Sequence, residues 1–300
     1  MKVAVTGGTG FVGGHLVDAL RQRGDEVWII SRSKGKSESR SDVHRVTWSE
    51  IAVSPSRLDG IDAIVNLAGE SINQRWTEAA KTRILQSRLD AASRIEHLVA
   101  SLNVKPDVVV NASGISIYGM SRSDTFDESS PWNISDFLSS VVEKWEAAAD
   151  RINVFRLVKL RVGLVLGKGG GAFPLMSLPY KLFAGGKVGS GKQWMPWLHI
   201  EDMVRLILFC IDNPNLEGPV NACAPHPVTN DAFGRALGRA LGRPHWFPVP
   251  AFILKTVLGE LSLLLLEGQR AVPRKAMEHG FTFSYPTIES AMAPLVGSHK

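Results

Sequence analysis

Two hydroxyl side chains that could take part in proton transfer follow an apolar run near the middle of the chain. The run Asp107–Ala112, with three consecutive valines, predicts a buried strand that leads into Ser113 and then Tyr118. A serine hydroxyl at a strand end can donate a hydrogen bond to a substrate carbonyl, and a phenol can exchange a proton during hydride transfer. A turn-forming role would explain Ser113 equally well. We treat both residues as candidate catalytic groups.

A glycine-rich turn at the start of the chain indicates the cofactor beside which these hydroxyls would act. Lys2–Thr6 is an apolar, β-branched run typical of a buried strand, and apolar residues then recur at helical spacing. The glycines therefore lie where a strand turns into a helix, which is where a dinucleotide places its pyrophosphate. A glycine motif alone is weak, but here both flanking elements are present. The residues expected to bind the cofactor at this turn are Gly7, Gly10, Phe11, Val12 and Gly13.

The end of the second predicted strand, Glu26–Ser31, favours NADP(H) over NAD(H). NAD-specific sites usually hold an acidic residue here, which binds the ribose 2′-hydroxyl. This chain has Ser31 and Arg32 instead, and an arginine suits a 2′-phosphate. The alternative is that Arg32 is a solvated loop charge. The basic residues that follow it are Lys34, Lys36 and Arg40.

A third strand end and a long helix add to the predicted cofactor site. The strand Asp62–Asn66 runs into a small-residue turn, which would let backbone lie along the adenosine and ribose side of a dinucleotide. The helix Thr77–Leu102 carries an arginine that could face either phosphate or solvent. The cofactor residues added by these elements are Leu67, Ala68, Gly69 and Arg88.

Strand and helix alternate about six times over the first 165 residues, which predicts a doubly wound parallel α/β sheet. Such sheets bind ligands at the carboxyl ends of their strands, where the residues named above lie. We expect residues 1–165 to form an NADP-binding Rossmann domain that segments near 193–225 rejoin, and residues 166–300 to form a smaller substrate-binding lobe. Other expected elements are strands at His44–Trp48, Val154–Val165 and Pro219–Ala222, and helices ending at Ala149, Asn213 and Leu241.

Composition and charge exclude several functional classes. The apolar content of 44% and charged content of 21% are ordinary for a globular protein. The net charge of +5 is modest and forms no dense basic stripe, so we expect no nucleic-acid partner. Cys210 and Cys223 are the two cysteines, and no metal-ligand spacing is present, so we expect no metal and a reduced pair.

The longest apolar run could suggest a membrane span, but its length and charges argue against one. Ala251–Leu266 is interrupted by Lys255 and Glu260, so it is too short and too charged for a membrane span, and we predict a buried helix there. The chain opens on a predicted strand, so we also expect no signal peptide. These features predict a cytoplasmic protein without a membrane partner.

The motifs together resemble the extended short-chain dehydrogenase/reductase superfamily. The markers are the glycine turn, Asn66–Gly69, Ser113 to Gly119 and Leu198–Asp202. More narrowly, the chain is similar to the epimerase family, atypical sugar-nucleotide epimerase-like members described as NADP-dependent oxidoreductases. The resemblance implies that NADP(H) is held by the glycine turn, by Ser31 and Arg32 and by Leu67 and Ala68, with Val165 near the nicotinamide. Further matches are Arg75–Thr77, Lys144–Ala148, Arg161–Gly167 and Leu266–Gln269.

The catalytic pair of this superfamily is missing. Its enzymes use a tyrosine four residues before a lysine, which lowers the pKa of the phenol. Here Arg122, Ala184 and Glu289 follow the three tyrosines at that spacing. Phe137 or Leu138 stands where the tyrosine belongs. Tyr118 could replace the missing phenol, although the superfamily often has a structural tyrosine at this position.

Three residues of the second lobe are candidates for contact with a substrate. Trp194 and Trp197 could rim the cleft and stack on a flat ligand, or pack between the lobes. His199 could line the pocket, although a lone histidine is more often packed than catalytic.

Two functions from different classes follow from these residues. The first is an NADP(H)-dependent oxidoreductase or epimerase-like enzyme with a modified acid/base set, acting on an unidentified small molecule. The second is a non-catalytic NADP(H)-binding sensor or scaffold. A homodimer is compatible with either function.

Overall fold

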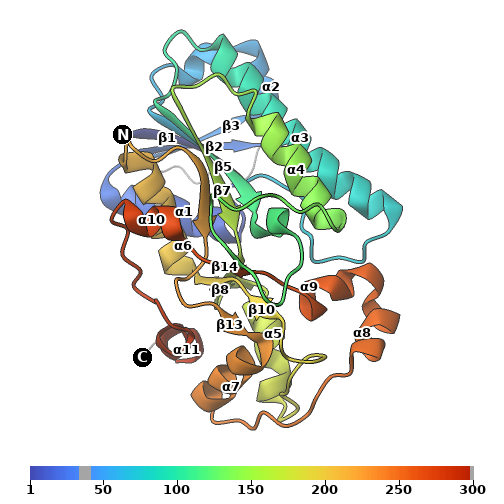
Figure 1. Ribbon diagram of the computed structural model, residues 1–300. Coiled ribbons are helices and arrows are strands. Elements are labelled where there is room, and N and C mark those ends of the chain that lie inside the picture. Colours follow the sequence, from blue (N-terminus) through green and yellow to red (C-terminus); the bar gives the residue numbers. More distant parts are fainter. Residues whose placement is uncertain (34–41, 298–300) are drawn as a thin grey trace.

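A central sheet covered by helices and a smaller lobe below it make up the computed structural model, which describes residues 1–33 and 42–297 (Figure 1). The sheet has seven parallel strands in the order β12-β7-β5-β4-β1-β2-β3. The predicted doubly wound parallel fold is therefore confirmed. The strands are β1 (Lys2–Thr6), β2 (Glu26–Ser31), β3 (Val43–Thr47), β4 (Ala63–Asn66), β5 (Val108–Gly114), β7 (Arg156–Val162) and β12 (Gly218–Ala222).

Helices cover both faces of the sheet, as parallel strands buried on both faces require. On one face α1 (Phe11–Arg23) and α6 (Ile200–Asp212) pack against side chains such as Val3 and Val5. On the other face α3 (Glu78–Ser101) and α2 (Trp48–Val53) pack against the alternate positions, such as Ala4. The C-terminal end of α4 (Phe137–Ala149) packs on this second face as well. No helix among the described residues is long and apolar enough to span a membrane.

Local signals fix the ends of several elements. Gly24 ends α1 with a left-handed backbone, φ +88°. Asp136 caps α4 by accepting a hydrogen bond from the Ser139 N–H at 2.7 Å. Thr47 caps α2, so Trp48 begins a helix and does not end the preceding strand as expected.

The predicted strand Val154–Val165 is in fact two strands that belong to different sheets. β7 ends at Val162, and β8 (Leu164–Gly167) starts after Gly163. A Cβ atom at Gly163 would lie 2.1 Å from the Pro196 carbonyl oxygen, so only glycine fits there. β8 pairs with β9 (Gly170–Gly171) and β11 (Trp197–His199), which carry the chain into the second lobe.

The second lobe has a core of its own around Trp197, Tyr180 and Phe233. Between Trp197 and Phe233 the chain returns to the main sheet, where Gly218–Ala222 forms β12, parallel to β7. The short strands outside the main sheet pair β10 (Trp194–Met195) with β13 (Val228–Thr229) and β6 (Thr125–Phe126) with β14 (Arg270–Ala271). The remaining helices are α5 (Phe173–Lys181), α7 (Asn230–Leu241), α8 (Ala251–Leu258), α9 (Leu263–Leu266), α10 (Arg274–Glu278) and α11 (Ile288–Val296). Short 3₁₀ helices are η1 (Pro55–Leu58), η2 (Ile115–Tyr118) and η3 (Gly259–Ser262).

The prediction of one buried helix over Ala251–Leu266 is wrong. The run is broken into α8, η3 and α9, and no residue of α8 is buried. Gly259 makes the break, with φ +60° and ψ −134°, a backbone conformation that favours glycine. The apolar residues of this run therefore lie largely on the surface of the lobe.

Candidate functional site

The glycine turn between β1 and α1 leaves no room for a side chain at two of its positions. Gly7 has φ +69°, and a Cβ atom there would lie 2.7 Å from the Leu67 carbonyl oxygen. A Cβ atom at Gly13 would lie 2.2 Å from the Gly7 carbonyl oxygen. The Gly10 N–H donates to that same carbonyl at 2.9 Å and closes the turn. The first turn of α1 holds no acidic residue, so its N–H groups and its dipole favour an anion.

Phe11, the first residue of α1, joins the glycine turn to the second lobe. Its ring lies against the β8–β9 hairpin, where a Cβ atom at Gly167 or Gly170 would be 2.6 or 2.7 Å from it. Val12 and Val165 are partly buried and pack against the core under the same turn. The structure thus brings these three predicted residues together beside the turn.

A buried amide ladder ties the neighbouring strand ends to the turn. The Thr6 hydroxyl donates to Asn66 Oδ1 at 2.6 Å, and Asn66 Nδ2 donates to Asn111 Oδ1 at 2.6 Å. Asn66 Oδ1 also lies 3.4 Å from the Ala68 N–H. Because the ladder crosses β1, β4 and β5, it holds the turn from Leu67 onward in place beside the glycines.

Arg88 braces the turn after β4 through one nitrogen of its guanidinium, Nη1. Its guanidinium donates to the Glu70 carbonyl at 3.0 Å and to the Ile84 carbonyl at 2.9 Å. It lies over the Trp145 ring at 5.1 Å and touches the place where Gly69 would carry a side chain. Burial lowers the pKa of Arg88 to about 10.

Ser31 ends β2 and Arg32 follows it, and both lie beside the glycine turn because Thr6 pairs with Ile30. Arg32 is exposed, and the Ser31 hydroxyl donates to the Ser33 carbonyl at 2.8 Å. The guanidinium is therefore accessible at the strand end where the 2′-phosphate was predicted. Lys34, Lys36 and Arg40 lie outside the described residues.

A buried polar network occupies the strand ends where acid/base chemistry was predicted. Glu146 of α4 and Arg161 of β7 form a bidentate pair, at 2.8 Å from Nε and 3.0 Å from Nη2. The Ser113 hydroxyl donates to Glu146 Oε1 at 2.6 Å. Arg161 Nη1 donates to the Tyr118 hydroxyl, which donates to Asn221 Oδ1, each at 2.8 Å. The network joins β5, β7, β12 and α4.

The network does not fit a catalytic role for Tyr118 or Ser113. The Tyr118 side chain has no exposed surface, and burial raises the pKa of its phenol to about 12. The Ser113 hydroxyl points to Glu146 inside the domain and is 4% exposed. Both candidates are better explained as structural residues, because their hydroxyl hydrogens are already committed to buried acceptors.

The position of the missing tyrosine is apolar in space as well as in sequence. Phe137 and Leu138 pack with Trp76 and Val141. Val142, four residues after Leu138, lies against Gly114 at the end of β5. No titratable group therefore replaces the tyrosine or its lysine on this helix face.

Ser116 is a hydroxyl that the sequence analysis missed. It lies on η2 directly after β5, is partly exposed, and its Oγ stands 3.3 Å from the place of a Cβ atom on Gly114. The alternation of side chains along a strand could have indicated it. Ser113 faces the interior, Gly114 faces outward without a side chain, and Ser116 is the next residue at an outward position.

The three predicted substrate residues of the second lobe lie in different settings. Trp197 has no exposed surface and belongs to the lobe core, so the packing alternative fits it. Trp194 is partly exposed, with Arg270 over its ring at 4.7 Å. His199 is 6% exposed, caps α6 by accepting from the Glu201 N–H, and burial lowers its pKa. Trp194 alone of the three presents an accessible surface.

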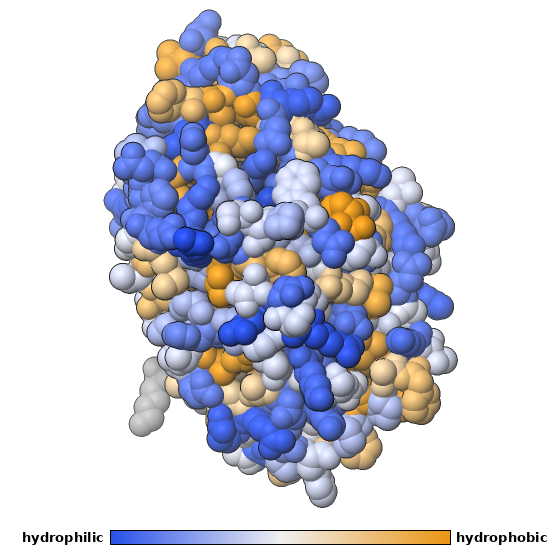
Figure 2. Space-filling view, viewed as in Figure 1, coloured by the Kyte–Doolittle hydropathy of each residue, from blue (hydrophilic) through white to orange (hydrophobic). Residues whose placement is uncertain are grey.

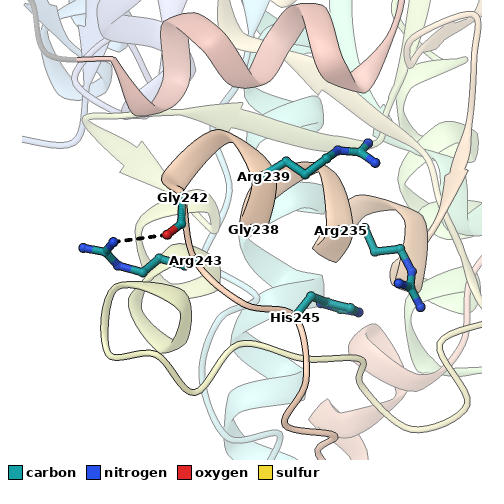
Figure 3. Close-up of a pocket in the computed structure, with 6 residues that line it drawn as sticks. All are labelled: Arg235, Gly238, Arg239, Gly242, Arg243 and His245. Carbon is teal, nitrogen blue, oxygen red and sulfur yellow. Dashed lines mark hydrogen bonds between the residues drawn. The ribbon is translucent and has the colours of Figure 1, made fainter.

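A separate hollow of about 410 Å³ lies on the second lobe, beside α7. Figure 3 shows its arginines, Arg235, Arg239 and Arg243, pointing in different directions. Arg235 pairs with Asp231 at 2.8 Å and Arg239 with Glu289 at 3.1 Å. The guanidinium groups therefore do not converge on one ligand, and the hollow adds nothing to the cofactor site.

Metal and disulfide chemistry find no support in the described part of the chain. It contains no group of three or more His, Cys, Asp or Glu residues placed to hold a metal ion. Cys210 and Cys223 are both free and buried.

The fold and the glycine turn define a dinucleotide-binding protein of the short-chain dehydrogenase/reductase type. Residues 3–223 match the NAD dependent epimerase/dehydratase family, and residues 249–295 match a domain of unknown function, DUF1731. The chain belongs to the NAD dependent epimerase/dehydratase family, and the resemblance drawn from the sequence is confirmed.

Similar proteins extend over the whole chain. Epimerase family protein YfhF of Bacillus subtilis (strain 168) is 42% identical over 302 residues, covering 100% of this chain and 99% of that protein. The crystal structure of human epimerase family protein SDR39U1 (isoform2) with NADPH is 38% identical, with a TM-score of 0.91 and coverage of 98% and 99%. A structure of MoeE5 with UDP-glucose and NAD, 19% identical, shares the fold with a TM-score of 0.78, over 98% and 97%.

Substitution of Gly13 by alanine should lower NADPH affinity at least about a hundredfold, because the new methyl group would push the Gly7 carbonyl out of the turn. Gly14→Ala is the matched control, since a Cβ atom there meets nothing within 4 Å. Isothermal titration of both variants with NADPH, after their folding is checked by circular dichroism, measures the effect. Equal affinity of the two variants would contradict the assignment of the turn.

Substitution of Tyr118 by phenylalanine should reduce the free energy of unfolding by about 2 kcal/mol at pH 7, because two buried partners lose their hydrogen bonds. The folded-state pKa is raised to about 12 from 10, so this contribution is present below pH 10 and is lost as pH rises toward 12. Urea unfolding of both proteins at pH 7 and pH 11 should show the difference shrinking. An unchanged stability at pH 7 would contradict the structural role.

Proposed function

We propose that this protein is an NADP(H)-dependent oxidoreductase, or an epimerase-like enzyme, that acts on a small molecule without a tyrosine–lysine dyad. The observation that carries the proposal is the glycine turn, where Gly7 and Gly13 pack against backbone with no space for a side chain. Such packing suits a backbone cradle for a pyrophosphate. The buried, unpaired cysteines support a reducing, cytoplasmic setting as part of the same proposal.

The preference for NADP(H) over NAD(H) rests on the end of β2. Arg32 is exposed there, beside the glycine turn, and no acidic side chain stands at the position that would bind a ribose 2′-hydroxyl. The NADPH in the solved human relative supports the same choice. Leu67, Ala68 and Gly69 would border the adenosine side, with Val165 beneath the turn.

The chemistry available to the chain is narrower than in enzymes with the dyad. Bound NADPH would supply the hydride. Ser116 would donate a hydrogen bond to a carbonyl oxygen of the substrate, since this residue is partly exposed just after the carboxyl end of β5. The apolar pair Leu138 and Val142 would exclude water from the same end of the sheet, and Trp194 would face the substrate.

A second candidate is a non-catalytic NADP(H)-binding sensor or scaffold. The enclosed phenol of Tyr118 and the apolar residues at the dyad positions favour it, because they leave no titratable group of the usual kind at the reaction site. Binding of NADPH would occur in both cases, so turnover distinguishes them.

Screening carbonyl compounds with NADPH, followed by absorbance at 340 nm, should find turnover that Ser116→Ala reduces about a hundredfold without a change in NADPH affinity. Ser129→Ala, in the loop after β6, is the control and should behave as wild type. Tight NADPH binding without turnover over a broad screen would favour the sensor.

Substitution of Arg32 by alanine should lower NADPH affinity about tenfold to a hundredfold and leave NADH affinity unchanged, because the charge-assisted contact to the 2′-phosphate is lost. The exposed Arg45→Ala on β3 serves as the control for a general loss of positive charge. Titration of each protein with both nucleotides measures the ratio. An unaltered preference for NADPH would refute the role of Arg32.

A further inference from the structure

Helix α8 is an apolar helix that the rest of the chain does not cover. Its sequence, AFILKTVL, contains one charged residue, Lys255, and no residue of the helix is buried. Phe252 is 70% exposed and Val257 is 64% exposed. Helices that are apolar on most sides are normally buried in a core or in a membrane. This helix therefore presents an apolar face to whatever surrounds the protein.

The exposed apolar surface continues beyond α8 on the same lobe. Trp246, 71% exposed, donates from Nε1 to the Phe183 carbonyl at 2.8 Å, so the segment before α8 lies against the end of α5. Figure 2 shows apolar colouring on the lower right of the molecule, where α8 lies in Figure 1. We call the following exposed residues the apolar lobe surface: Leu178, Leu182, Phe183, Trp246, Phe247, Phe252, Ile253 and Val257.

Positive charge borders the apolar lobe surface. Lys181 ends α5, the Lys187 carbonyl accepts from the Val249 N–H at 2.9 Å, and Arg243 lies over the Phe183 ring at 4.3 Å. Lys255 stands on α8 itself. None of these four cations pairs with a carboxylate among residues 1–33 and 42–297. The nearby acidic groups have other partners: Glu260 pairs with Lys81, and Asp231 pairs with Arg235.

The basic border decides whether a second copy of the chain or a lipid surface fits the apolar lobe surface better. In a two-fold dimer built on the apolar lobe surface, the same patch would face itself, and its basic border would meet a second basic border. Like charges brought together across an interface are unfavourable. An anionic lipid surface offers the opposite charge around an apolar interior, which suits an apolar helix bordered by lysine and arginine.

We propose that the apolar lobe surface binds the face of an anionic lipid bilayer, with α8 lying in the interface. Phe252 and Val257 would enter the acyl region, and Trp246 would sit at the depth of the head groups, where tryptophan is enriched. The four cations would contact the anionic head groups. The inference departs from the expectation, drawn from the sequence, that the protein has no membrane partner.

Co-sedimentation with vesicles tests the proposal on the full chain. The protein should bind vesicles of phosphatidylcholine mixed with phosphatidylglycerol and should not bind phosphatidylcholine alone. The double variant Phe252→Ser/Val257→Ser should weaken binding at least about tenfold. The control Phe155→Ser, 86% exposed in the turn before β7, should bind as wild type. Lys255→Gln should weaken binding about fivefold at low salt, whereas Lys144→Gln, exposed on α4, should have no effect.

Sedimentation velocity without lipid tests the alternative that a second copy of the chain covers the apolar lobe surface. A dimer that the double variant converts to a monomer, together with no binding to anionic vesicles, would show that a second copy covers this surface and would overturn the proposal. Equal binding by the double variant and by Phe155→Ser would overturn it as well, since the apolar lobe surface would then not be the contact.

Discussion

The buried pair between Arg161 and Glu146 is the interaction on which the middle of this structure depends. Their side chains are 2% and 0% exposed, so neither charge can be satisfied by water. Removing one partner of such a pair costs about 3–5 kcal/mol, because the other charge is left buried and alone. Ser113, Tyr118 and Lys159 all attach to the pair, and together they fix β5, β7 and α4 relative to one another.

That constraint decides what the strand ends can do chemically. The hydroxyl hydrogens of Ser113 and Tyr118 are donated to buried acceptors, so both residues help to hold the sheet together, which favours a structural role for them. The apolar packing around Leu138 removes the other usual position. The polar positions that the network leaves open include the exposed Arg32, the N-terminus of α1 and the partly exposed Ser116. Arg32 and the N-terminus of α1 lie beside the glycine turn, and Ser116 lies at the end of β5.

The sequence predicted most of the fold because its signals are local and strong. Valine-rich strands, the cap at Asp136 and the glycine at the end of α1 act within a few residues. Contacts between residues far apart in the sequence could not be predicted in this way. Nothing in the local pattern shows that Arg161 donates to Tyr118, or that the Pro196 carbonyl lies too close to Gly163 for any side chain there. The helix expected over Ala251–Leu266 failed for a related reason, because periodicity reports apolar character and not whether other residues cover it.

Phe11 connects the predicted cofactor site to the second lobe. As the first residue of the helix whose N-terminus would face a pyrophosphate, it is held by Gly167 and Gly170 of the β8–β9 hairpin. β8 also pairs with β11, which leads into α6 through His199. The Phe11 ring takes up the space that side chains at Gly167 and Gly170 would need, so α1 packs directly on this hairpin. The second lobe is thus in direct contact with the helix that follows the glycine turn.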